Sequence, residues 1–499
     1  MQNIQLLGIA PSGILKHECE CISPILSDFI STLNELNKNG LTLRIKGKDI
    51  KYFGFLAFTL GDTLAQNWLA GFFESVGKTR RFCRNCEITY DERKNGDFSS
   101  KYESRKLNSH LDQLSMIDES PSLSKFFGIK SRSELLKIKD FDVCQSFLQD
   151  PMHTLIQGVC LIEMKYLFIY FIEEKKIKLN FLNEAILSFN YPLLDKDNKP
   201  NNLIQQNHID NASFSLNASQ ILTLILNFPL IMGDLFFQNE DENWKNFLRL
   251  NEIVNLVFAF FYDKKTIETL DSLIHKYLNT FKLLYNDASI TPKMHFLTHF
   301  PAQMENFGPL RHHHCFRFEA KNGLMLEMIN KNFIDVGYSI ANNHQFWIAC
   351  KQNQLKKQNF SSLNDFCKIE KRVEPYEKFA LDLRPISFLS VCKSLKKDGF
   401  KYYKSYLLVL NDDFVFGDSK NVAQIVELLN CENKFIFYCE KLKLIRFVKY
   451  NNSFELAKTG NYFYLKYEEL IFKQPNFVFN EDNNNLFMQL RYFHRTFND

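Results

Sequence analysis

The stretch from Leu41 to Cys86 constrains the fold more than any other, because it sets two β-rich runs, an acidic residue and a helix in immediate succession. The first run covers Leu41–Ile45 and the second Ile50–Leu60, and the polar residues 46–49 between them predict a turn. The second run ends abruptly at a Gly-Asp pair, which places Asp62 at the end of a strand that we expect to be buried. The stretch therefore predicts a hairpin that leads into a strand, an aspartate and a helix.

Asp62 has two interpretations. Strand, acidic residue and helix in this order is how α/β folds present carboxylates to metal ions, since the strand is rigid and its carboxyl end opens onto the ligand-binding crevice. Gly-Asp before a helix is also a common helix start, and from the local sequence alone capping is the favoured explanation of Asp62. The helix is predicted by apolar residues at helical spacing, namely Leu64, Trp68, Leu69 and Phe72.

The composition is that of a globular protein with two to four domains. Of its 499 residues 45% are hydrophobic and 24% are charged, which are ordinary values. The net charge of +4 is too small to predict nucleic-acid binding by itself, so such binding needs a local patch, and Arg80, Arg81 and Arg84 form one. Twelve cysteines are too few for a disulfide scaffold and indicate a reducing intracellular compartment. The most apolar predicted helix, Thr154–Ile172, carries two charges in its middle, so we expect no membrane span.

Cys83 and Cys86 form a CxxC pair. This pair is one half of many tetrahedral zinc sites, because two thiolates at this spacing can share one ion across a turn. His110, 24 residues after Cys86 (110 minus 86), is the nearest further candidate ligand. Two free buried thiols or a redox pair are the alternatives to zinc.

Two later histidines, His295 and His299, are four residues apart and therefore lie on one face of a helix, which suits a metal ion. A zinc protease would need Glu directly after the first of them, and Phe296 stands there, so we do not expect that activity. A zinc metalloenzyme that combines this pair with Cys83 and Cys86 is a separate hypothesis.

Other charged groups stand at predicted helix starts. Asp150 precedes Pro151 at the start of the long apolar helix, and capping explains it, but capping does not explain His153 three residues later. Glu319 falls in the first turn of a later helix, where an acidic side chain favours the helix dipole. Arg311 begins a basic run that could touch phosphate.

The order of these motifs resembles the catalytic region of transposases of the CACTA (En/Spm-like) group, especially the animal transposon-derived proteins related to them. The resemblance covers roughly residues 5–345 and rests on the order of the motifs rather than on any single one. The motifs are TLGDTLAQNWLAGFFES with FCRNC, then DPMHTLIQG, then PKMHFLTHFP with FGPLRHHHCFRFEAKN.

The resemblance implies an α/β fold with an RNase H-like catalytic core interrupted by a large all-helical insertion, and the residue pattern near the C-terminus predicts a small all-β domain after it. It implies that Asp62 is the second catalytic aspartate and that Glu319 is the closing glutamate, on a helix that returns to the core. Asp150 and His153 match the D-x-x-H signature of the family, with a supporting role. Residues 180–290 indeed carry helical apolar stripes, and strand-like alternation begins near residue 365. We therefore expect a partial core over 1–90, a mostly helical insertion with a zinc-linked segment over 91–290, returning helices over 291–365 and the β domain over 366–499.

The same resemblance implies DNA cleavage and strand transfer with Mg²⁺ or Mn²⁺ held by Asp62 and Glu319, while a structural Zn²⁺ is suggested by the CxxC pair alone. Two such ions about 4 Å apart stabilise both the attacking and the leaving oxygen of a phosphodiester displacement. The implied partners are the DNA ends of a transposon and a second copy of the chain, without a membrane, and the implied location is the nucleus. Basic residues near Arg80, Arg81, Arg84 and Arg311 would hold phosphate.

One expected element does not match. The first aspartate of the family lies upstream of the region that corresponds to residues 1–40, and the sequence begins too late to contain it. We therefore expect a truncated and inactive transposase as one outcome. The alternative is a domesticated, noncatalytic module that binds nucleic acid or protein.

Overall fold

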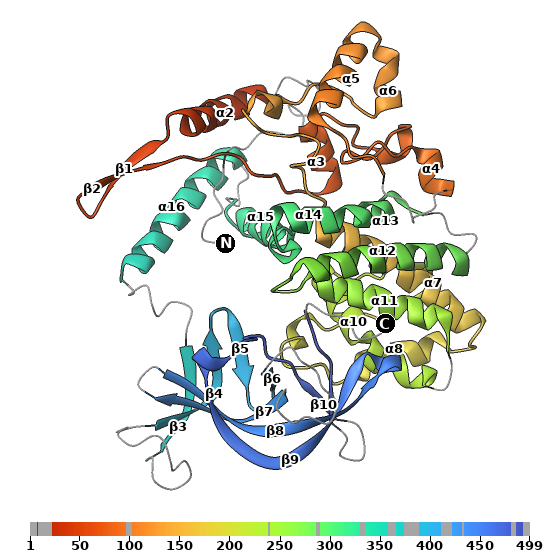
Figure 1. The fold of residues 1–499 in the computed structure, drawn as a ribbon, viewed down its shortest axis with the longest axis vertical. Coiled ribbons are helices and arrows are strands. Elements are labelled where there is room, and N and C mark those ends of the chain that lie inside the picture. The colour runs from red at the N-terminus through yellow and green to blue at the C-terminus, as the bar shows by residue number, and fades with distance from the viewer. Residues whose placement is uncertain are drawn as a thin grey trace. The chain divides into compact units, whose positions relative to one another are not determined.

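The computed structural model of the chain describes residues 7, 22–95, 102–237, 240–285, 290–329, 335–357, 366–373, 389–410, 422–431, 434–480 and 486–492. The protein is mixed α and β, with a helical region and a C-terminal sheet that curves into a half-barrel (Figure 1). The chain divides into two compact units. The first comprises residues 1–188, 198–226 and 240–346, and the second comprises residues 189–197, 227–239 and 347–499.

The first unit begins with helix α2 (Ser23–Lys38) and the hairpin of β1 (Leu41–Ile45) and β2 (Lys48–Tyr52). The predicted hairpin is confirmed, with a tighter turn than expected: Lys46 and Gly47 both have positive φ, at 48° and 79°, and form a two-residue loop. Such primed turns match the twist of the two strands, and glycine adopts the second position without strain.

The predicted buried strand Ile50–Leu60 is wrong in length and in burial. Strand β2 ends at Tyr52, every residue of the hairpin is exposed, and residues 53–58 have no regular secondary structure. Only Thr59 pairs again, in a single parallel bridge with Phe147. Hydrophobic residues with β propensity form a long strand only where a neighbouring strand takes up their backbone hydrogen bonds.

Short helices follow and surround Asp62 and the CxxC pair. They are α3 (Thr63–Ala70), α4 (Tyr90–Asn95), α5 (Leu107–Glu119) and α6 (Ser124–Phe127), with 3₁₀ turns at Val76–Lys78, Pro121–Leu123 and Glu134–Lys137. Leu114, Ile129 and Phe147 belong to one buried apolar cluster together with the α2 residues Leu26 and Ile30. This cluster joins α2 to α3, α5 and α6.

The helical region comes next, and the predicted helices in it are confirmed. It opens with a π-helix, η4 (Met152–Val159), which runs on into α7. The further elements are α7 (Cys160–Glu173), α8 (Leu179–Ser188), α9 (Gln206–Asp210), α10 (Ala218–Met232), α11 (Glu242–Val257), α12 (Lys264–Leu284), α13 (Pro292–Phe296), η7 (Leu297–His299), α14 (Phe300–Phe307), α15 (Phe316–Glu327) and α16 (Val336–Lys357).

Two of these segments, Met152–Glu173 and Ala218–Phe236, are long and apolar enough to cross a membrane by length and composition alone. Of their most apolar windows 56% and 67% is buried inside the structure, and core helices of globular proteins have the same character. In the first segment Phe171 packs against Trp244 of α11, with ring centroids 6.2 Å apart. The apolar residues of that segment therefore serve the core.

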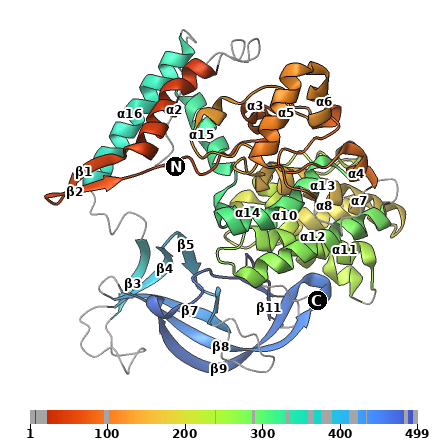
Figure 2. The same cartoon turned by 45° about the horizontal axis from the view of Figure 1, so that its top comes forward.

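The second unit is built on an antiparallel sheet with nine strands among its described residues, as the alternating pattern beyond residue 365 predicts (Figure 2). Its order is β10-β11-β9-β8-β7-β4-β3, with β5 paired to β4 and β6 to β7. Register shifts in the long β8–β9 pair bend the sheet. The strands are β3 (Phe366–Val373), β4 (Leu389–Lys397), β5 (Phe400–Tyr403), β6 (Leu407–Val409), β7 (Val422–Cys431), β8 (Lys434–Val448), β9 (Ser453–Lys466), β10 (Val478–Asn480) and β11 (Leu486–Met488).

Candidate metal centre

Two cysteines and two histidines from distant parts of the chain meet in the first unit. The Sγ of Cys83 lies 3.2 Å from Nε2 of His299, and the Sγ of Cys86 lies 3.2 Å from Nε2 of His295. The two Nε2 atoms are themselves 3.2 Å apart, and all four candidate ligand atoms lie within 4.8 Å of one another. The CxxC pair thus has its missing partners more than 200 residues further along the chain.

The local sequence explains how each half is presented. Thr291 caps α13 through its hydroxyl, which accepts from the N–H of Met294 at 3.4 Å, and Pro292 follows at the first helical position. His295 lies on α13 and His299 ends the following 3₁₀ turn η7, so both imidazoles face the same side. The predicted helical face with two histidines is therefore present.

The four groups fit a zinc ion. Zinc is held tetrahedrally by thiolate at about 2.3 Å and by imidazole at about 2.0–2.1 Å, which gives edges of roughly 3.3–3.8 Å between ligand atoms. The observed separations are close to these edges, and three of the four residues are buried. Two thiolates and two imidazoles without an open position form a structural site.

The ionisation of the two thiols agrees with a role as zinc ligands. Burial opposes ionisation of Cys83, but a hydrogen bond from Cys86, the charge of His299 and a hydrogen bond from His295 outweigh it and lower the pKa of Cys83 well below its ordinary value. Burial and the neighbouring Cys83 raise the pKa of Cys86. The cluster therefore favours one thiolate even before a metal adds its charge.

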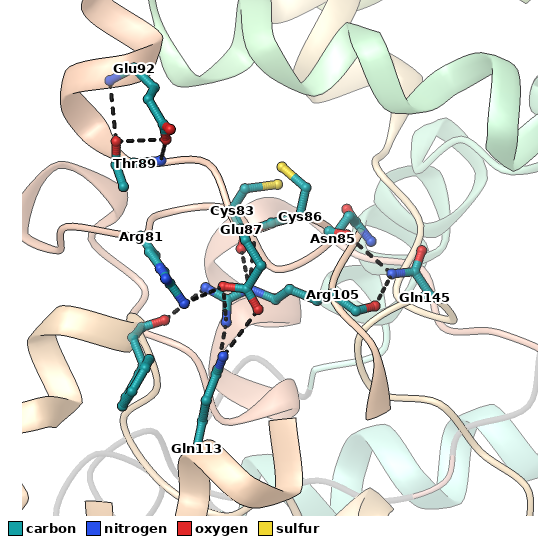
Figure 3. Close-up of polar contacts among 11 residues, drawn as sticks. Arg81, Cys83, Asn85, Cys86, Glu87, Thr89, Glu92, Arg105, Gln113 and Gln145 are labelled. Atoms are coloured by element: carbon teal, nitrogen blue, oxygen red, sulfur yellow. Dashed lines mark hydrogen bonds and ion pairs between the residues drawn. The ribbon is translucent and has the colours of Figure 1, made fainter. Parts of the chain in front are cut away.

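A buried arginine, Arg105, binds the backbone of the CxxC turn (Figure 3). Nε of Arg105 donates to the carbonyl of Cys83 at 2.8 Å and to that of Cys86 at 3.2 Å. Its Nη1 donates to Gln113 at 3.1 Å and lies 3.7 Å from the carboxylate of Glu87. Nothing in the sequence signals this role of Arg105, which lies 19 residues beyond Cys86.

His110, the further candidate ligand that the sequence offered for the CxxC pair, is not part of the group. Its buried ring packs against Phe72, with centroids 5.3 Å apart, and burial together with Arg105 and Arg132 lowers its pKa to about 4. Nearness in sequence misled the prediction, because α5 carries His110 into the apolar cluster of α2 and α3. The ligands come from α13 and η7 instead.

A second cluster lies around His153 and contains two of the predicted site residues, Asp150 and Glu319, in direct contact with its ring. Nδ1 of His153 donates to Asp150 at 2.5 Å, and its Nε2 lies 3.4 Å from Glu319. The hydrogen bond to Asp150, with the charges of Asp150, Glu319 and Asp62, raises the pKa of His153 despite the effect of burial. The charges of Asp62 and Glu319, which are separated by 257 positions (319 minus 62), thus both act on the same imidazole.

The carboxylate of Asp150 joins two helix starts. One oxygen accepts from the N–H of Met152 at 3.2 Å and from that of Cys315 at 3.0 Å, and the other accepts from the N–H of His153 at 3.0 Å. Cys315 is the N-cap of α15, the helix that carries Glu319. Capping explains Asp150, as the sequence predicts, and its link to Cys315 is a connection that the sequence does not reveal.

Asp62 and Glu319 are the less enclosed members. Asp62 caps α3, because its Oδ1 accepts from the N–H of Ala65 at 2.7 Å. The capping hydrogen bond uses only one carboxylate oxygen of Asp62, so capping leaves the other oxygen for a further interaction. Glu319 lies in the first turn of α15 with half of its side chain exposed. Both carboxylates retain oxygen atoms that a divalent ion could use.

The predicted phosphate-binding arginines have different surroundings. The prediction is wrong for Arg84, which is 2% exposed and donates to the carbonyls of Phe147 and Leu148, both at 3.1 Å. Burial lowers its pKa to about 10, and the charges of Cys83 and Asp150 oppose this decrease. Arg84 therefore lies between the metal centre and the acidic cluster.

The other three arginines are at least partly accessible. Arg80 is exposed, with its guanidinium 5.0 Å from the ring centroid of Phe126, and Arg81 is half-buried and paired with Glu87 at 2.7 Å. Arg311 is half-buried and donates to the carbonyl of Phe258 at 2.6 Å.

No protein-family model matches the chain, and no curated protein matches it.

Proposed function

We propose that this chain is a transposon-derived protein of the DDE class, which acts on DNA in the nucleus by metal-dependent cleavage and strand transfer. Asp62 and Glu319 are its metal-binding carboxylates. The observation that carries the proposal is the convergence of Asp62, Asp150 and Glu319 on His153, from three separate motifs that stand in the order of that transposase group.

The RNase H-like core belongs to the same proposal. Its support is the parallel bridge between Thr59 and Phe147, which brings together two segments that each end in an acidic residue three positions further on, Asp62 and Asp150. Parallel pairing places two carboxyl ends at one edge, where α/β proteins bind their ligands. The helical region between Asp150 and Glu319 is the insertion in this interpretation.

The residues of the cluster have distinct roles. Mg²⁺ or Mn²⁺, when bound, would stabilise the charge that develops on the attacking and leaving oxygens of the phosphodiester. Asp62 and Glu319 offer the hard oxygen ligands that these ions prefer. Asp150 is a positioning residue, because its oxygens are occupied by N–H donors and it fixes the ring of His153.

A zinc ion in the Cys83, Cys86, His295 and His299 site has a structural role in this proposal. It would fix the CxxC turn, whose Arg84 lies between that site and Asp150, to the helices that precede Glu319. A zinc metalloenzyme is less well supported, because a four-ligand site leaves no position for substrate.

The second candidate function is a noncatalytic nucleic-acid-binding module. The exposed guanidinium of Arg80 favours it, since this group is available to phosphate without any metal. The two candidates differ in which substitutions matter.

Nicking of supercoiled plasmid by the full chain with Mn²⁺ tests the proposal. We expect Asp62→Asn and Glu319→Gln each to lower the nicking rate at least a hundredfold, because each removes a metal ligand. Asp28→Asn on α2 and Glu327→Gln on α15 are matched controls at exposed positions and should retain the rate. Equal rates in all four variants, or no nicking by the unaltered chain, would reject catalysis. DNA binding that is lost in Arg80→Ala but not in Asp62→Asn would then support the noncatalytic module.

A further inference from the structure

The hairpin of β1 and β2 is an arm whose outer edges pair with no other strand in the described part of the chain. Among the described residues it forms a two-stranded sheet, and every residue of both strands is exposed. Figures 1 and 2 both show it extending away from helices α3 and α5 at the end of α2. An isolated two-stranded hairpin is marginally stable in water, and a third strand or a packed face is needed for stability. The arm is therefore suited to accept another strand.

The two faces of the arm differ sharply. One face is mostly apolar, with Lys48 as its charged member, and its apolar side chains are Leu41 (52% exposed), Leu43 (43%), Ile45 (39%), Ile50 (40%) and Tyr52 (44%). On the opposite face Arg44 stands across from Asp49, with 4.0 Å between Nε and the carboxylate. Such an amphipathic hairpin determines which face of an added strand must be apolar. A shift of the added strand by one residue would move its apolar side chains to the polar face of the sheet.

Strand β2 is complementary to itself. Its sequence is Lys48-Asp49-Ile50-Lys51-Tyr52. When two copies pair antiparallel about a two-fold axis at Ile50, Asp49 stands opposite Lys51 of the second copy, and the same pair occurs again on the other side of the axis. Ile50 meets its own equivalent, and Lys48 stands opposite Tyr52. Opposite charges directly across a strand pair are favourable, and so is a cation near an aromatic ring.

The backbone agrees with this register. In an antiparallel hairpin with a two-residue loop, the pair next to the loop exchanges hydrogen bonds, and alternate residues along the strand direct their N–H and C=O groups outward. Ile45 and Lys48 flank the loop, so the outward groups of β2 belong to Asp49 and Lys51. The two-fold axis at Ile50 pairs these outward groups with each other.

The edge of β1 lacks this complementarity. The same operation about Leu43 would place Thr42 opposite Arg44 of the second copy, without any opposite charge. The β2 edge is thus the one that fits. We propose that the chain self-associates through β2, with the arms of two copies joined into a four-stranded antiparallel sheet around Ile50. The apolar row across that sheet is then Leu43, Ile50, Ile50 and Leu43.

Sedimentation equilibrium of the full chain tests this proposal. We expect a concentration-dependent dimer of modest affinity, because a pair of five-residue edges is a small interface. Asp49→Lys and Lys51→Asp should each weaken dimerisation at least tenfold, because each places like charges in contact. The two variants mixed together should associate again, because the mixture restores opposite charges at both pairs. Asp28→Lys, an equal change of charge on exposed α2, is the matched control and should dimerise as the unaltered chain does.

Three results would overturn the proposal. These are a monomer at every concentration, a dimer that ignores both charge reversals, and single variants that stay apart when mixed. If the chain is monomeric but Lys51→Asp weakens its binding to a fluorescent DNA duplex, the arm is a nucleic-acid contact instead. None of these results depends on nicking activity, so the proposed function stands or falls separately.

Discussion

Glu163 shows how strongly the environment of one residue can act in this protein. The side chain is fully buried between α7 and α12, and its Oε2 accepts a hydrogen bond from the hydroxyl of Tyr277 at 2.9 Å. Burial raises the pKa of Glu163 to about 8, although the hydrogen bonds from Tyr277 and Tyr285 oppose the increase. A carboxyl group that the sequence shows only as a charge within an apolar helix is therefore neutral over most of the physiological range.

Glu163 makes the stability of the protein depend on pH. Below pH about 4.5 the group is protonated whether the chain is folded or unfolded. Between there and its folded pKa of about 8 only the unfolded chain ionises, so the free energy of unfolding falls as the pH rises, by about 1.4 kcal/mol for each pH unit at most. Glu163→Gln keeps the shape of the side chain but cannot ionise. We therefore expect the melting temperature of this variant, relative to that of the unaltered chain, to be higher at pH 8 than at pH 5.

Calorimetry at both pH values measures this effect. Glu173→Gln, at the exposed end of the same helix, is the control and should follow the unaltered chain. A constant difference in melting temperature between Glu163→Gln and the unaltered chain would contradict the assignment.

At the scale of elements, local sequence patterns predicted the helices and strands that depend only on residues close together in the sequence. The helices within residues 180–290 and the strands beyond 365 follow from apolar periodicity, and the helical face shared by His295 and His299 follows from their spacing. The apolar run after Ile50 did not become a buried strand, because a strand needs a partner that no local pattern supplies. The choice of His295 over His110 likewise depends on the packing of distant elements.

Arg105 gives the CxxC turn a testable support. Because its guanidinium holds the carbonyls of Cys83 and Cys86, we expect Arg105→Met to leave the ligands in place but to lower the zinc affinity about tenfold to a hundredfold. Competition with a chromophoric zinc chelator measures the affinity. Arg132→Met is the control, since that residue makes an exposed ion pair with Asp118 at 3.1 Å. Equal affinities in both variants would show that the turn holds its shape without Arg105.

At the scale of the molecule, the four-ligand site joins the N-terminal segment of the first unit to its later helices. Cys83 and His299 are 216 residues apart in sequence. Closing so long a loop carries a large entropy cost, and a metal that binds only the folded chain offsets it. The convergence of Asp62 and Glu319 spans a similar separation, and sequence motifs suggested these residues without giving their distance in space.

Removal of zinc should therefore loosen the whole first unit. We expect the purified chain to contain one zinc ion per molecule, and a strong chelator to lower its melting temperature by ten degrees or more, because the binding energy of a structural zinc is folding energy. Cys83→Ser should abolish both the zinc content and the response to chelator. Cys350→Ser, at an exposed thiol, should change neither. Zinc content is measured by atomic emission, and a chain that lacks zinc yet melts as before would refute the site.

The distance along the chain between the two halves of the metal centre also imposes an order on biosynthesis. While the protein is being made, Cys83 and Cys86 leave the ribosome long before His295 and His299 exist. During that interval the two thiols lack both imidazole partners, so oxidants and competing metal ions can react with the CxxC pair alone. The centre can therefore shield its cysteines only after residue 299 has itself left the ribosome.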